Sequence, residues 1–228
     1  MNTTTINTKA DLSQLLAAVE KANSFYAENM EKVSEKGLQK DQYMRFLRMQ
    51  YHLTKGVQNT FLGIASHSET RPYKKLRKFL VNFAYEEEMH YKLAEKDLQR
   101  LGGTPEATPF PVELWWQYQK YVVQHKPLER LGATAVLENI GNYAAPIIKK
   151  MFAEANYINS QNTSFATVHM HEELPHGDQI LDALSAENFS QNHLSQLNEG
   201  ARRATWLYAS VIYQWIMNGE LKPIPFFS

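Results

Sequence analysis

Apolar residues recur along most of the chain at the spacing of one helix face, and no stretch keeps the alternation typical of a strand. The pattern predicts helices over residues 11–36, 41–66, 72–101, 112–124, 128–157, 165–184 and 186–217. The segment 104–111 holds three prolines and is short enough to be a connection within one domain. We therefore predict an all-α fold of about seven helices, forming a single domain over residues 1–228.

The amino-acid composition indicates the class of protein and the partners to expect. Hydrophobic residues make up 43% and charged residues 21%, which is ordinary for a soluble globular chain. The formal net charge is zero, so nucleic acid is not an expected partner. The start of the chain lacks the pattern of a secretory signal, and no apolar run reaches the roughly 20 residues that span a membrane. We expect a cytoplasmic protein without a membrane partner.

The sequence contains no cysteine. This excludes disulfides, thiolate nucleophiles and cysteine-ligated metal centres together. Any metal ion must therefore be bound by nitrogen and oxygen atoms.

Glu87 and His90 lie three positions apart in the third predicted helix and share its apolar face with Phe83. Polar groups on a buried face are costly unless they are paired or bind a metal ion. The neighbours Glu86 and Glu88 point elsewhere on the helix and are expected to be solvated. Glu87 and His90 are therefore candidate ligands.

Glu138 is a second candidate, because it lies in an apolar window over residues 135–140. The alternative for this carboxylate is an ion pair with a basic residue of another helix. A third cluster, His169, Glu173 and His176, has the i, i+4, i+7 spacing of one helix face.

Pro175 complicates the third cluster, because an interior proline removes a backbone hydrogen bond and kinks a helix. His176 could be displaced by such a kink. His171 or Asp178 would then be the alternative ligand.

These stretches together indicate a two-metal site. Imidazole and carboxylate suit iron or manganese, and Glu-x-x-His pairs in helical bundles bind di-iron centres. A ferritin-like bundle would also need an inward glutamate from the helix at 41–66, which contains none. We predict two metal ions, iron or manganese, with the ligands Glu87, His90, Glu138, His169, Glu173 and His176.

Residues 83–102 and 127–138, with His169, Glu173 and His176, resemble the heme-oxygenase-like group of iron-containing redox enzymes. That group is related in fold to pyrroloquinoline-quinone synthase and to the TenA thiaminases. The resemblance implies a heme-oxygenase-like helical bundle in which these positions hold two irons that activate O2, so the expected cofactor is two iron ions per chain. TenA chemistry depends on a cysteine, so it does not carry over to this chain.

The expected function is a non-heme di-iron oxidase or oxygenase, an oxidoreductase that uses O2 to oxidise a small organic substrate. Its partners would be that substrate and O2, and a homodimer is a possible assembly. The alternative is a metal-free enzyme similar to pyrroloquinoline-quinone synthase, or a small-molecule binder of the same fold, with His90 and His169 as acid–base groups. A non-catalytic interaction protein is the third hypothesis.

Side chains near the centre are also expected to shape a substrate pocket. Aromatic candidates for an apolar wall are Tyr85, Trp115, Trp116, Tyr143 and Phe152. Arg202 and Arg203, in the last predicted helix, are candidates for binding a carboxylated substrate.

Overall fold

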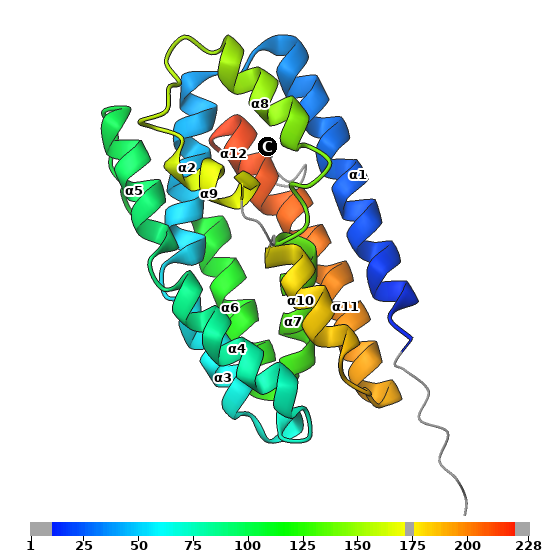
Figure 1. Cartoon of the computed structure of the whole chain (residues 1–228). Coiled ribbons are helices and arrows are strands. Elements are labelled where there is room, and N and C mark those ends of the chain that lie inside the picture. Colours follow the sequence, from blue (N-terminus) through cyan, green and yellow to red (C-terminus); the bar gives the residue numbers. More distant parts are fainter. Residues whose placement is uncertain (1–10, 172–175, 222–228) are drawn as a thin grey trace, which may run out of the picture.

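The computed structural model describes residues 11–171 and 176–221. Every regular element within these ranges is a helix, which confirms the all-α class and the bundle of about seven helices. In Figure 1, α1 and α5 lie along opposite sides of the bundle, and α8 lies across its upper end. The described elements, in chain order, are α1 (Ser13–Lys36), α2 (Lys40–Thr54), α3 (Gln58–Ser66), η1 (Ser68–Thr70), α4 (Lys74–Glu87), α5 (His90–Arg100), α6 (Phe110–His125), α7 (Pro127–Leu137), α8 (Ala145–Glu154), α9 (Ser164–His171), α10 (His176–Ser185), α11 (Gln191–Leu207), η2 (Tyr208–Ile212) and α12 (Tyr213–Asn218).

Several helices predicted as continuous are divided, and two of the divisions have a local cause. Gly56 has a φ of 88°, a left-handed conformation that only glycine adopts readily, and it separates α2 from α3. Residues 138–144 form turns between α7 and α8, where Gly141 precedes Pro146 in the first turn of α8. The predictions of single helices over 41–66 and 128–157 were therefore wrong in extent.

The division between α4 and α5 has no such local cause. Residues 88–89 form a turn, although neither is a glycine or a proline. The turn lies between Glu87, the last residue of α4, and His90, the first residue of α5. The last predicted helix also differs, because α11 begins at Gln191, after Ser190 caps it, and continues into a π-helix, η2.

The most closely packed pair of helices is α7 and α11, where backbone meets backbone. A Cβ atom placed on Gly200 would lie 1.8 Å from the carbonyl oxygen of Glu129, and one on Gly132 would lie 1.9 Å from that of Leu197. The two glycines let the helices approach closely. Residues Pro127–Val136 of α7 are all buried, so this helix forms the centre of the bundle.

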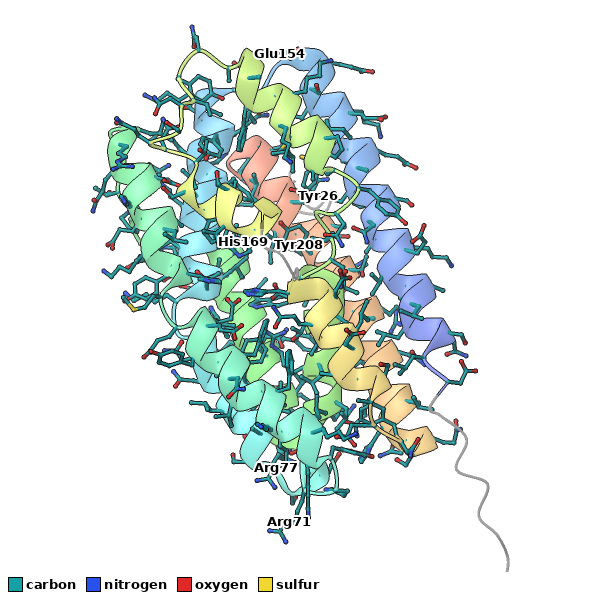
Figure 2. All side chains as sticks on the ribbon, in the orientation of Figure 1. Tyr26, Arg71, Arg77, Glu154, His169 and Tyr208 are labelled. Atoms are coloured by element: carbon teal, nitrogen blue, oxygen red, sulfur yellow. The ribbon has the colours of Figure 1, made fainter. Side chains whose placement is uncertain are left out.

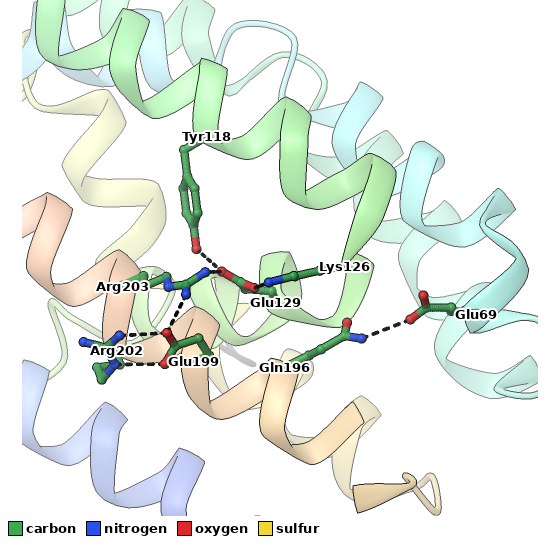
Figure 3. A network of polar contacts seen from close by, with 8 residues as sticks. All are labelled: Glu69, Tyr118, Lys126, Glu129, Gln196, Glu199, Arg202 and Arg203. Carbon is green, nitrogen blue, oxygen red and sulfur yellow. Dashed lines mark hydrogen bonds and ion pairs between the residues drawn. The ribbon is translucent and has the colours of Figure 1, made fainter. Parts of the chain in front are cut away.

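A polar network holds the first turn of α7 in place (Figure 3). The carboxylate of Glu129 is almost completely buried and accepts hydrogen bonds of 2.6 Å from Tyr118 of α6 and from Arg203 of α11. Arg203 also pairs with Glu199 at 2.7 Å. Buried charges are tolerated when they are paired in this way, and the network therefore fixes α7 between its neighbours.

The glycine contact gives the first prediction. Replacing Gly200 by Ala forces a methyl group into the backbone of α7, so we expect the free energy of unfolding to fall by about 1–3 kcal/mol or more. Urea denaturation measures this change. Gly141→Ala is the matched control, because a Cβ at Gly141 meets nothing within 4 Å. Equal stability of the two variants would contradict the close helix contact.

Candidate metal centre

The candidate centre is built around Glu87, the last residue of α4, which is only 4% exposed. Its Oε2 atom lies 3.1 Å from Nδ1 of His90, one turn further along the chain. Its Oε1 atom lies 2.8 Å from Nδ1 of His176, the first residue of α10. One buried carboxylate therefore contacts two imidazoles from two other helices.

Glu138 reaches the same place from the end of α7. Its Oε2 atom lies 3.8 Å from Nδ1 of His176, and its side chain is 20% exposed. Close packing between α10 and the turn after α7 makes this approach possible. A Cβ on Gly177 would lie 2.4 Å from Oδ1 of the buried Asn139, so only glycine fits beside His176 here.

His169, on α9, completes a group of three imidazoles. Its ring centroid lies 5.2 Å from that of His90 and 6.2 Å from that of His176. In Figure 2, His169 lies near the middle of the bundle's length, as do Tyr26 and Tyr208. Nδ1 of His169 donates a 2.7 Å hydrogen bond to the carbonyl of Phe165, which orients the ring and makes Nε2 the nitrogen with which this side chain could bind a metal ion.

The position of α9 itself depends on a residue that the sequence did not reveal as important. Asp97 of α5 is fully buried, and its Oδ2 atom accepts a 2.8 Å hydrogen bond from the backbone N–H of Phe165, in the first turn of α9. A carboxylate is stabilising at a helix N-terminus. Asp97 therefore fixes the start of the helix that carries His169.

The charges of the central group depend on one another. Burial alone would raise the pKa of Glu87, but the adjacent His176 and His90 outweigh it and lower that pKa to about 2. Burial alone would lower the pKa of His176, but Glu138 and Glu87 reverse this and raise it to about 10. The pKa of His90 is also raised, because Glu87 outweighs the effect of burial. Without metal, Glu87 and His176 form a buried ion pair.

Other predicted residues are placed as follows. Glu173 and Pro175 lie outside the described residues, as does the side chain of His171. Asp178 is exposed, so it does not take the place of His176. The helix predicted over 165–184 is not one straight helix, since α9 and α10 point in different directions in Figure 1.

The two glutamates that flank Glu87 are exposed, as the helix periodicity predicts. Glu86 nevertheless lies close to the centre, because its Oε2 atom is 4.0 Å from Nε2 of His176. Glu88 makes no ion pair with a described residue.

The donor atoms fit iron. One ligand atom each from Glu87, His90 and His176 lies within 4.8 Å of the others, and oxygen with imidazole nitrogen is a donor set that iron accepts. Among the described residues, Oε1 of Glu87 and Nδ1 of His90 are buried without a well-directed hydrogen bond. Buried polar atoms in that condition are unusual, and a metal ion would satisfy them.

Arg130 is the main feature that sequence reasoning missed. It lies on α7 two turns before Glu138, and Thr134 lies between them, so the three side chains share one face of the helix. Arg130 is 3% exposed and donates a 2.6 Å hydrogen bond to Oγ1 of Thr134. An i, i+4, i+8 search for polar residues along 127–138 would have found this stripe.

A cavity of about 460 Å³ opens beside the centre. Glu87, Arg130, Glu138, His169 and His176 all line it, among mostly apolar side chains. This volume is within the range of about 300–1,000 Å³ that is usual for small-molecule sites.

The aromatic candidates for the cavity wall divide into two groups. Trp115 and Phe152 line the cavity as predicted. Tyr85 and Tyr143 are 80% and 47% exposed, and Trp116 is not a lining residue, so these three predictions were wrong.

The predicted arginines do not reach the cavity. Arg203 pairs with Glu129 and Glu199, and Arg202 is exposed and pairs with Glu199 (Figure 3). Among the described residues, the arginine that lines the cavity is Arg130.

Comparison with solved structures defines the class of fold. The chain matches the crystal structure of a domain of unknown function with a heme oxygenase-like fold from Shewanella denitrificans, with a TM-score of 0.76. The match covers 93% of this chain and 97% of the other, at 20% sequence identity. The protein therefore has a heme oxygenase-like fold, as the sequence resemblance implied.

The family follows from the sequence profile of the iron-containing redox enzymes, which matches residues 44–209. This is well over half of the chain, and it includes Glu87, His90, Glu138, His169 and His176. The chain belongs to this iron-containing redox enzyme family. No curated protein matches it. Within the described residues, no helix has both the length and the apolar character to cross a membrane.

The central contacts predict how variants bind iron. We expect Glu87→Gln and Glu138→Gln to lower the iron bound per chain by at least half, because each removes a charged donor that an amide replaces poorly. Glu88→Gln is the matched control, since Glu88 is adjacent but exposed. Iron analysis after anaerobic Fe(II) loading measures the stoichiometry, and circular dichroism checks that helical content is kept. Equal iron in all three variants would remove Glu87 and Glu138 from the ligand set.

Iron binding should also release protons. His176 must lose its proton before it can bind a metal ion, and Glu138 and Glu87 hold its pKa at about 10 in the metal-free protein. The apparent affinity for Fe(II) should therefore rise with pH through the neutral range, by up to about tenfold per pH unit for each proton displaced. Titration calorimetry in two buffers of different ionisation enthalpy measures the protons released. A pH-independent affinity between pH 6.5 and 8 would contradict this prediction.

Proposed function

We propose that this protein is a non-heme di-iron oxidase or oxygenase, which uses O2 to oxidise a small organic substrate bound in the central cavity. The observation that carries the proposal is the meeting of Glu87, Glu138, His169 and His176 on the wall of that cavity, with His90 in contact with Glu87. The two irons would be held by these five side chains together with Glu173. Iron would supply the redox electrons and the open positions at which O2 reacts.

The protein's own residues have distinct parts in this function. Glu87 and Glu138 neutralise positive charge at the centre, and Glu87, at the junction of α4 and α5, is almost out of contact with water. The hydrogen bond from His169 to the Phe165 carbonyl sets the direction of one ligand before any substrate arrives. The apolar side chains of the cavity hold the substrate and exclude bulk water from the reaction.

A metal-free activity of the same fold is the second candidate. The specific observation in its favour is the buried pair of Glu87 and His176, in which a carboxylate holds an imidazole in its protonated form. Such a pair can act as a general acid toward a bound substrate. This candidate needs no iron, so metal stoichiometry separates it from the first.

The test is anaerobic titration with Fe(II), followed by exposure to O2. We expect about two irons per chain at saturation, and O2 consumption by the loaded protein that is faster than by free Fe(II) under the same conditions. Wild-type protein and the Glu87→Gln variant are compared side by side. Loss of both iron and O2 consumption in the variant is the expected result.

Two outcomes would overturn the proposal. A wild-type chain that binds no iron at saturating Fe(II) would favour the metal-free candidate. A stoichiometry of about one iron, unchanged by Glu138→Gln, would contradict the two-metal assignment.

A further inference from the structure

Arg130 is a cation in an unusual place. It is 3% exposed, it lines the central cavity, and its guanidinium lies 5.3 Å from the ring centre of Phe61. One guanidinium nitrogen is bound to Thr134, but Nε has no hydrogen bond within the part of the chain that the structure describes. A buried guanidinium donor is normally paired, so this one has unused capacity to bind an anion or a carbonyl group.

The charges around Arg130 do not remove its positive charge. Burial lowers the pKa of Arg130 to about 10, with Glu138 and Glu87 opposing that change. Arg130 therefore remains a cation at neutral pH. No carboxylate of the described residues lies within ion-pair distance of it, since the described ion pairs of arginine are those of Arg48, Arg202 and Arg203.

Bound metal would make this end of the cavity more positive. Two divalent ions would carry more positive charge than the carboxylates of Glu87 and Glu138 neutralise, and Arg130 adds to the excess. An anionic group would be favoured beside the centre by both sources of charge. A guanidinium binds a carboxylate through parallel hydrogen bonds, which also fixes the orientation of the ligand.

The remainder of the cavity is suited to an apolar group. Met30 and Val33 of α1, Met151 of α8 and Tyr213 of α12 form a buried apolar cluster, and all four line the cavity. Burying apolar surface there is favourable by about 25 cal/mol per Å². A ligand with one anionic end and an apolar body matches both parts of the cavity.

We propose that the cavity binds a monocarboxylate with an apolar body, its carboxylate held by Arg130 beside Glu87 and Glu138. This inference rests on the proposed function, because it names the class of substrate that would be oxidised there. Arg130 sets the end of the substrate that faces the centre. The apolar cluster of α1, α8 and α12 accommodates the body, either alkyl or aryl.

The test compares acids with a neutral analogue of the same length. Octanoate, 3-phenylpropanoate and octan-1-ol are titrated by calorimetry into the full-length protein, metal-free and loaded with Fe(II) under anaerobic conditions. We expect Arg130→Gln to weaken binding of the acids by about tenfold to a hundredfold, the value of a charged hydrogen-bond pair. Binding of octan-1-ol should change by less than about threefold. Stronger binding of octanoate than of 3-phenylpropanoate identifies an alkyl body, and the reverse order an aryl one.

Two further variants keep the result interpretable. Arg130→Lys keeps the charge but loses the planar fork, so an intermediate loss of acid affinity is expected, and it replaces the glutamine variant if that fails to fold. Arg202→Gln is the matched control, because Arg202 is exposed and outside the cavity. This control should bind all three ligands as the wild type does.

The outcomes separate the two proposals. Two results would overturn the carboxylate site: equal affinity of the wild type for the acids and the alcohol, or an equal loss of affinity for both in Arg130→Gln. Arg130 would then only balance the charges of Glu87 and Glu138. Acid binding that depends on Arg130 in a protein that takes up no iron would keep the carboxylate site while overturning the di-iron function. Normal iron uptake without selective acid binding would do the opposite.

Discussion

Glu87 carries a negative charge in the interior of a helical bundle, and the centre of the structure is arranged around that charge. An ionised carboxylate is strongly disfavoured in an apolar environment unless cations or hydrogen-bond donors surround it. His90 and His176 supply that compensation in the metal-free protein, at 3.1 and 2.8 Å. Four helix ends meet as a result: the end of α4, the start of α5, the end of α7 and the start of α10. If a metal ion binds, the same imidazoles would lose their protons and bind the ion, and the metal would then supply the positive charge beside Glu87.

Helix α7 links the stability of the fold to this centre. Its side toward α11 carries Gly132 in backbone contact, and Glu129 near the start of the helix is held by Tyr118 and Arg203. Another face carries Arg130 and Glu138 into the cavity. The contacts with α6 and α11 therefore fix where these two side chains point. Because one helix carries both faces, the polar network around Glu129, outside the cavity, also helps to position Arg130 and Glu138 inside it.

Sequence periodicity predicted the helical class and the inward position of Glu87 and His90, because both follow from spacing along the third predicted helix, which the structure divides into α4 and α5. The turn at 88–89 was not predictable in that way, since no glycine or proline precedes it. Contacts between different helices were equally hidden. Asp97 at the start of α9 is one example, since only the fold brings these segments together. Arg130 is a different case. Its spacing from Glu138 can be read from the sequence, but arginine is rarely buried, so nothing in the sequence placed it in the interior.

X-ray absorption at the iron edge of the anaerobically Fe(II)-loaded protein tests directly whether a di-iron centre forms around Glu87. We expect a first shell of mixed oxygen and imidazole nitrogen donors, with iron–iron scattering at about 3.5–4 Å. The imidazole contribution should fall in His176→Ala, because His176 contacts both Glu87 and Glu138. A shell of oxygen donors alone, without imidazole or iron–iron scattering, would contradict a di-iron centre built on Glu87.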